Sequence, residues 1–128
     1  MGGAMQDVAI ASRELAVTVS PLGAELQSLT LSSGEDLLWN GDPSFWSGRS
    51  PLLFPIVGRV LNDRIKHKGR YFPLPSHGFA RRRIFELVEQ SAASCRFLLR
   101  ADEETLQAYP FPFELSVAYE IHGASLHI

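Results

Sequence analysis

The chain has 128 residues, of which 45% are hydrophobic and 20% charged, as in one ordinary globular domain. It holds no run of eighteen apolar residues and no basic-then-apolar start, so neither a membrane partner nor a secretory signal is expected. A single cysteine, Cys95, excludes an intrachain disulfide and a multi-cysteine metal site, and nothing points to an oxidising compartment, so the expected location is the cytoplasm.

The dominant hydrophobic period along the chain is two, which indicates strands with one buried face. It is clearest where Leu15, Val17 and Val19 alternate with polar or smaller residues. In chain order, strands are predicted at 14–20, 25–31, 64–68, 70–74, 84–90, 94–101, 114–121 and 126–128. One helical turn is predicted at 103–108, with Asp102 as its N-cap.

Short strands separated by close turns predict an all-β fold, an antiparallel β-sandwich or barrel. The expected organisation is one domain over 1–128, with 1–12 as a start that is either disordered or left over from cloning. The alternating pattern still runs at residue 128. We therefore expect a partial domain, cut short or completed by a strand from a partner.

The segment from Trp39 to Arg83 differs from the rest of the chain. Residues 59–83 hold eight basic residues and one acidic residue, although the whole chain has a net charge of −2. Two prolines, at 51 and 55, predict that 52–57 is an extended loop pressed into the core. Such a loop would deliver Arg59 to a particular place, and the alternative for Arg59 is a surface ion pair.

His77 is flanked by Pro75 and Gly78, which constrain the backbone on both sides. Two interpretations remain open: a hydrogen-bonding or acid–base histidine, or a turn histidine bonded to the backbone. The four histidines lack a metal-ligand spacing, so no metal is expected.

Aromatic residues interleave with the arginines, which is the mixture that binding of nucleic acid by stacking and phosphate contacts requires. On a strand, however, Arg81, Arg82 and Arg83 would point alternately to opposite faces, and the chain is acidic as a whole. A nucleic-acid partner is therefore not expected.

Several motifs in series carry a resemblance to a known family. They are "GAEL" at 23–26, "LWN" at 38–40, "PLLFPIVGR" at 51–59, "HGFAR" at 77–81 and "AYPFPF" at 108–113. This series resembles the aldose 1-epimerase (galactose mutarotase-like) family, and its spacing is most similar to the LacX-type bacterial branch. The resemblance runs from about residue 15 to residue 128 and covers the N-terminal part of the family's chain.

The resemblance implies a large antiparallel β-sandwich (supersandwich) that interconverts the α and β anomers of a free aldose by acid–base ring opening, with no metal or organic cofactor. It implies a small-molecule sugar as partner, an aldohexose with or without a phosphate. Carried over by motif, the catalytic residues are His77 and Arg59. The substrate-binding residues are Asn62, Arg64, Phe79 and Arg81.

The same resemblance implies an incomplete site, because the family's second histidine and base glutamate belong to its C-terminal part. We therefore expect a chain that is weakly active or inactive alone. Two alternatives remain: a non-catalytic carbohydrate-binding module, in which Trp39, Trp46 and Phe79 stack on sugars instead of packing in the core, and a structural oligomer that completes itself through edge strands. The corresponding partner is another copy or a complementary C-terminal half.

Overall fold

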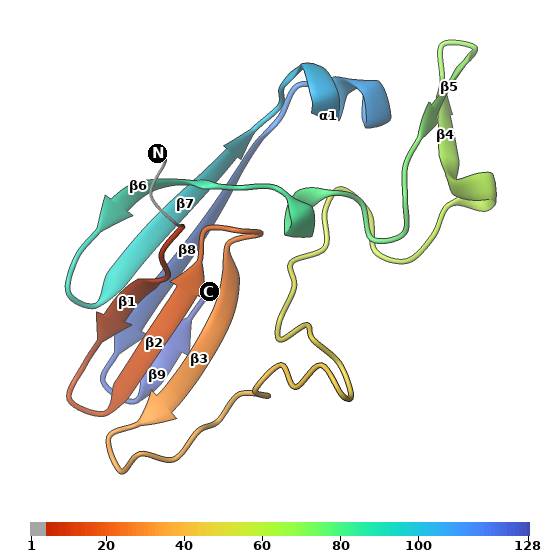
Figure 1. Cartoon of the computed structure of the whole chain (residues 1–128). Coiled ribbons are helices and arrows are strands. Elements are labelled where there is room, and N and C mark those ends of the chain that lie inside the picture. The colour runs from red at the N-terminus through yellow and green to blue at the C-terminus, as the bar shows by residue number, and fades with distance from the viewer. Residues whose placement is uncertain (1–4) are drawn as a thin grey trace.

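The computed structural model describes residues 5–128, which form two antiparallel sheets, a separate hairpin and one short helix (Figure 1). The first sheet has the order β1 (Val8–Ala11), β2 (Leu15–Ser20), β3 (Glu25–Leu31). The second has the order β6 (Glu86–Gln90), β7 (Ser94–Arg100), β8 (Glu114–His122), β9 (Ser125–His127). The hairpin pairs β4 (Arg64–His67) with β5 (Arg70–Pro73).

The core lies between the apolar faces of the two sheets. In β2, burial alternates along the strand, with Val17 and Val19 inside, and in β7 and β8 the same alternation buries Phe97 and Tyr119. These side chains belong to one hydrophobic cluster that both sheets share. A period of two in the sequence has therefore produced a sandwich, which confirms the all-β antiparallel fold class.

Backbone hydrogen bonds join the two sheets at their edges. The N–H of Ala11 donates to the carbonyl of Ala92 at 2.9 Å. At the other end, Gly23 N–H donates to the carbonyl of Arg83 at 2.7 Å, and Phe85 N–H donates to the carbonyl of Pro21 at 2.8 Å. The last two bonds fix where residues 83–85 join the sandwich. They therefore also fix the end of the preceding loop, which holds His77.

The stretch between β3 and β4 contains no strand and runs beside the sandwich to the β4–β5 hairpin, which projects away from both sheets (Figure 1). The start of its proline-rich part is anchored by Glu25. The Glu25 carboxylate accepts hydrogen bonds from the N–H groups of Arg49 and Ser50, both at 2.9 Å. An extended loop held at residues 49–50 therefore carries the chain towards Arg59.

The predicted strands are confirmed to within two residues at each end, but three other expectations need correction. Part of the 1–12 start is ordered, because Val8 and Ile10 are buried and β1 pairs with β2; residues 1–4 lie outside the described residues. The strand on which Arg81, Arg82 and Arg83 would have pointed alternately does not form at the first two, because Arg81 and Arg82 lie in a 3₁₀ turn, η2 (Ala80–Arg82). Trp39 and Trp46 are exposed instead of packed in the core.

Helix α1 (Glu103–Ala108) has the predicted bounds and the predicted N-cap. The Asp102 carboxylate accepts from the N–H of Thr105 at 2.8 Å, and the Thr105 hydroxyl in turn accepts from the N–H of Asp102 at 2.9 Å. The carboxylate also pairs with Arg83, which precedes β6. Helix α1 is therefore tied to the chain that leaves the His77 loop.

Replacing Asp102 with alanine is expected to cost about 1 kcal/mol of the free energy of unfolding, because the cap is lost. The Thr105 N–H and the smaller contribution of Arg83 hold the pKa of Asp102 below its usual range. Because this pKa is lower than the value of about 4 in the unfolded chain, the ionised carboxylate stabilises the folded state at pH values above about 4. The difference in free energy of unfolding between the parent and Asp102→Ala should therefore shrink as the pH falls below that value. Urea unfolding at several pH values measures this. Glu103→Ala, which leaves the cap intact, is the control, and an equal loss there would contradict the assignment.

Candidate functional site

The candidate site is built where the proline-rich loop meets the His77 loop. Phe54 and Gly78 form an isolated parallel bridge, in which the carbonyl of Phe54 accepts from the N–H of Phe79 at 2.9 Å and of Ala80 at 3.2 Å. The Phe54–Pro55 peptide bond is cis. Two segments that are distant in the sequence are thus joined through their backbones, so the side chains on both have fixed positions.

His77 is held by the backbone of a single residue. Its N–H donates to the carbonyl of Gly58 at 2.8 Å, and its ring Nδ1 accepts from the N–H of Gly58 at 2.9 Å. The backbone of His77 has φ of 64°, a left-handed conformation that is uncommon for a side-chain-bearing residue. The turn interpretation of His77 is therefore correct for Nδ1. Nε2, by contrast, makes no hydrogen bond to any residue between 5 and 128 and is not fully buried.

Arg59 lies at the surface and forms the ion pair that was the alternative for it. Its Nε and Nη2 donate to the two carboxylate oxygens of Asp63 at 2.9 and 2.7 Å. Hydrogen bonding by the Arg59 guanidinium lowers the pKa of Asp63 below its usual value. Arg59 and Asp63 line a hollow of about 480 Å³, together with the chain from Pro73 to Ser76. The pair thus stands beside the segment that leads into His77.

Asn62 and Arg64 lie at the base of the hairpin. Asn62 is exposed and has φ of 57°, and Arg64 begins β4. The guanidinium of Arg64 stacks 3.9 Å above the ring of Tyr71, on the neighbouring strand. Neither residue lines the hollow beside Arg59. Of the two candidate arginines, Arg59 is therefore the one that the structure places next to the His77 loop.

Phe79 and Arg81 follow His77 directly. Phe79 is partly buried and packs against Phe54 and Phe113, with ring centroids 6.2 and 5.9 Å apart. The ring of Phe79 is thus packed against other aromatic rings instead of being open for stacking on a sugar. Arg81 donates from Nη2 to the carbonyl of Ser76 at 3.4 Å, and its Nε is buried without a hydrogen-bond partner among the described residues. Arg81 consequently keeps unused donor capacity beside the loop.

The structure therefore brings four of the six predicted site residues to one loop: His77, Phe79 and Arg81 lie on it, and Arg59 is attached to it through Gly58. The sequence reasoning did not single out Asp63 or Ser76 as part of the site. A signal for Asp63 was present, because it is the one acidic residue in the basic stretch and stands four residues after Arg59. Ser76 acts through its carbonyl, which no sequence pattern reveals.

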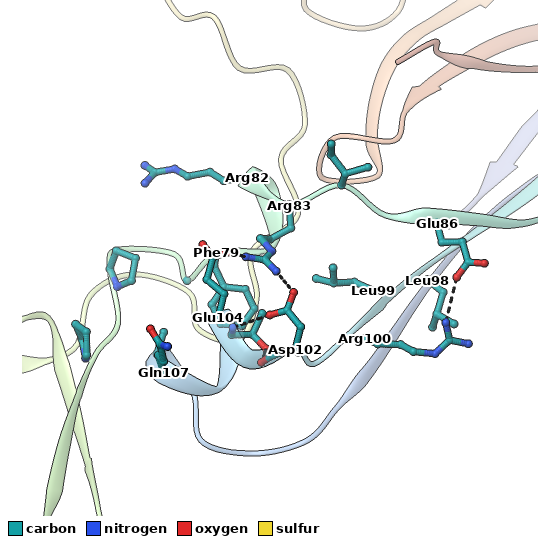
Figure 2. Close-up of a pocket in the computed structure, with 16 residues that line it drawn as sticks. Phe79, Arg82, Arg83, Glu86, Leu98, Leu99, Arg100, Asp102, Glu104 and Gln107 are labelled. Atoms are coloured by element: carbon teal, nitrogen blue, oxygen red, sulfur yellow. Dashed lines mark hydrogen bonds and ion pairs between the residues drawn. The ribbon is translucent and has the colours of Figure 1, made fainter. Parts of the chain in front are cut away.

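A larger cavity, of about 840 Å³, opens on the other side of the loop, between the 73–86 segment, β7 and α1 (Figure 2). Its charged side chains are engaged with one another: Arg83 reaches Asp102 and Glu104, and Arg100 reaches Glu86, while Arg82 extends away (Figure 2). Of the six predicted residues, only Phe79 lines it. The two Arg83 pairs hold α1 in place, the Arg100 pair joins β7 to β6, and together they leave few charged groups for a ligand.

Metal and thiol chemistry have no visible support in the part of the chain from residue 5 onward. No group of three or more His, Cys, Asp or Glu side chains there is placed to hold a metal ion. Burial raises the pKa of the Cys95 thiol, which keeps it protonated in the core. None of the helices in residues 5–128 is both long and apolar enough to span a membrane.

Comparison with known proteins identifies the family. The family model for aldose 1-epimerase matches residues 6–128. The chain belongs to the aldose 1-epimerase family. The LacX protein encoded on a plasmid of Lactococcus lactis subsp. lactis is 35% identical over 117 residues, which are 88% of this chain and 39% of that protein.

Solved structures of galactose mutarotase-like proteins share this fold. A galactose mutarotase related enzyme from Lactobacillus acidophilus superposes with a TM-score of 0.92 at 39% identity, over 94% of this chain and 41% of that one. A galactose mutarotase-like protein from Lactobacillus casei gives a TM-score of 0.90 at 30% identity, over 94% and 42%. The chain spans about two-fifths of the length of these relatives.

Proposed function

We propose that this chain forms one wall of a sugar site in an aldose 1-epimerase, which interconverts the α and β anomers of a free aldose. The observation that carries the proposal is the His77 loop. There, Gly58 fixes the backbone and ring of His77, and the ring Nε2 makes no hydrogen bond within residues 5–128. Arg59 lies beside the same loop, and Arg81 lies on it. Fixed hydrogen-bond donors of this kind suit the hydroxyl and ring oxygens of a sugar.

The reaction opens and recloses the sugar ring. A base removes the proton of the C1 hydroxyl while an acid protonates the ring oxygen, the C1–O bond to the ring breaks, and rotation about C1–C2 exposes the other face of the aldehyde before closure. Donors near the ring oxygen or a hydroxyl stabilise the negative charge that develops there. His77 and Arg81 supply such donors.

A carboxylate base bonded to His77 is the component that residues 5–128 do not show. Asp63 is the carboxylate beside the loop, and both of its oxygens are engaged by Arg59. Among residues 5–128, no carboxylate hydrogen-bonds to His77. We therefore propose that the base comes from outside these residues and that the chain alone is weakly active or inactive. Its length, about two-fifths of its relatives', supports this view.

An aldohexose is the proposed substrate class, and a phosphorylated aldose is the variant that the basic segment favours. Arg82 is exposed and extends away from the acidic groups of the larger cavity (Figure 2). The proposed location is the cytoplasm, where a buried thiol such as that of Cys95 stays reduced.

A sugar titration combined with polarimetry tests the proposal. We expect weak binding of glucose or galactose, a loss of about three- to tenfold in affinity for His77→Ala, as for one hydrogen bond, and little acceleration of the change in rotation of freshly dissolved α-sugar. His122→Ala, at the exposed end of β8, is the matched control. Fast mutarotation that depends on His77 would overturn the incompleteness. Absence of binding to any aldose would overturn the sugar site.

A non-catalytic carbohydrate-binding module is the second candidate, because the tryptophans lie at the surface. Trp46 is 53% exposed, and the indole N–H of Trp39 donates to its carbonyl at 2.8 Å, which orders the pair. Exposed, ordered indole faces are suited to stacking on sugars. Quenching of tryptophan fluorescence by sugar that persists in His77→Ala but disappears in Trp46→Ala would favour this candidate.

A macromolecular partner is proposed for the exposed apolar side chains between β3 and β4. Phe45, Val57 and Leu61 are 80%, 77% and 85% exposed, so a partner that covered them would bury apolar area. The relatives superpose on this chain with only about two-fifths of their length. The partner is therefore a complementary half of the fold or another copy of the chain. Light scattering distinguishes them, and a strict monomer with a cooperative melt would remove the self-completing oligomer.

A further inference from the structure

His77 and Gly58 are joined by two hydrogen bonds that form a closed pair. The carbonyl of Gly58 accepts from the backbone of His77 at 2.8 Å, and the N–H of Gly58 donates to ring Nδ1 at 2.9 Å. The two residues lie 19 positions apart. The backbone of one residue, Gly58, therefore fixes both the position of the His77 loop and the direction of the His77 ring.

The second of these bonds determines where the imidazole carries its proton. A backbone amide nitrogen can only donate, so the atom opposite it must present a lone pair. In a neutral imidazole one nitrogen is a donor and the other an acceptor, and the bond made by one fixes the role of the other. With Nδ1 as the acceptor, the single ring proton lies on Nε2.

We infer that Gly58 is a positioning residue: its backbone N–H holds His77 in the tautomer protonated at Nε2, so that His77 meets a sugar oxygen as a hydrogen-bond donor and not as a base. The sugar part of this inference rests on the proposed function, whereas the tautomer does not. His77 then binds and polarises an oxygen of the sugar, and a different group removes the C1 proton.

The conformation of Gly58 explains why a glycine stands at this position. Its φ is +86°, in the left-handed region, yet a Cβ built there would meet nothing within 4 Å. Space does not demand glycine at position 58; the backbone angle does. That angle aims the N–H of Gly58 at the ring, and the left-handed φ of His77, at 64°, brings the ring to meet it.

Strain in the same loop supports a functional role. Side-chain-bearing residues with positive φ cost free energy and gather at binding sites. Five such residues occur among the described residues, and two of them are His77 itself and Asp63, which lines the hollow beside the segment that leads into His77. His77 keeps a costly conformation, and the two bonds to Gly58 are what hold it.

Nitrogen NMR of the full chain tests the tautomer directly. Long-range ¹H–¹⁵N correlations from the His77 ring are expected to show a protonated Nε2 and an unprotonated, acceptor-type Nδ1. In Gly58→Ala the fixed tautomer should give way to a mixture of the two. Gly34→Ala is the matched control, because Gly34 has φ of +92° and is equally open, so it carries the same backbone strain without touching His77.

The results separate positioning from general destabilisation. Both glycine variants are expected to lower the unfolding midpoint by similar amounts, while only Gly58→Ala changes the ring signals. A protonated Nδ1 in the parent protein would overturn the inference. So would an unchanged tautomer in a folded Gly58→Ala.

Amide substitutions test the direction of the hydrogen bond to the sugar. In His77→Gln, the amide N–H₂ reaches the place of Nε2 and can donate. In His77→Asn, the shorter amide occupies the place of Nδ1 and leaves that of Nε2 empty. We expect His77→Gln to bind sugar within about threefold of the parent and His77→Asn to lose about tenfold, as for one hydrogen bond.

The two experiments fail independently. If His77→Asn binds sugar as well as His77→Gln does, the donor role is wrong although the sugar site stands. If the parent chain binds no sugar, the proposed function and the donor role both fall, and the NMR result alone decides the role of Gly58 in setting the tautomer.

Discussion

Gly78→Ala is expected to destabilise the protein by more than about 3 kcal/mol, the range of the most disruptive single substitutions. A Cβ at this position would lie 2.2 Å from the carbonyl oxygen of Phe54 and 2.5 Å from its carbon. Those atoms are backbone, so no side-chain rotation relieves the overlap. The same carbonyl accepts the hydrogen bonds of Phe79 and Ala80, and the clash therefore breaks the joint between the two loops.

The backbone angle adds to this cost, because Gly78 has φ of +71°. Gly69→Ala separates the two contributions. Gly69, in the β4–β5 turn, has φ of +79° and open space around it, so it should lose only about 1 kcal/mol, the cost of a left-handed alanine. Urea unfolding of both variants measures the difference. Equal losses would show that the contact between Phe54 and Gly78 does not limit stability.

How far the sequence predicts this fold can be seen in β2 and β1. In β2, Leu15, Val17 and Val19 alternate with polar or small residues over six positions, and this pattern defines both the strand and its buried face. In β1 the same alternation covers only four residues, and alanines occupy the exposed positions. Because the exposed positions of β1 are also apolar, the sequence does not show a clear alternation there. The strand is therefore evident only from its pairing with β2 in the structure.

The site was less predictable than the fold, because its geometry depends on backbone angles. The motifs pointed to His77 and Arg59, but nothing in the sequence says that a glycine at position 58 is left-handed or that it faces a ring 19 residues later. Arg81 to Arg83 show the same limit. Three consecutive arginines gave no sign of a 3₁₀ turn, which sends Arg81 to Ser76 and Arg83 to Asp102.

Tyr119→Phe is expected to cost about 1–3 kcal/mol at neutral pH, the penalty for leaving a buried acceptor unsatisfied. Tyr119 is 1% exposed, and its hydroxyl donates to the carbonyl of Ala24 at 2.6 Å, across the core between the two sheets. Ala24 is itself fully buried and has φ of 48°. Without the phenol, that carbonyl loses this donor, in a place that water does not reach.

The same phenol makes the parent protein sensitive to alkaline pH. Burial, with smaller contributions from Cys95 and Glu25, raises the pKa of Tyr119 to about 12, against about 10 in an unfolded chain. Between these values the folded state keeps the proton and the unfolded state releases it. The contribution of Tyr119 to the free energy of unfolding is therefore complete below pH 10. It is lost as the pH rises towards 12, and the total loss is about 3 kcal/mol.

Unfolding free energies measured from pH 8 to pH 12 test both statements. The difference between the parent and Tyr119→Phe should be largest near neutral pH and should close above pH 10, because only the parent has the buried phenol to ionise. Tyr71→Phe, on the exposed hairpin, is expected to stay within about 0.5 kcal/mol of the parent at neutral pH and to keep the alkaline loss. A constant difference across this range would mean that Tyr119 ionises alike in both states, which would contradict a buried hydroxyl that donates to Ala24.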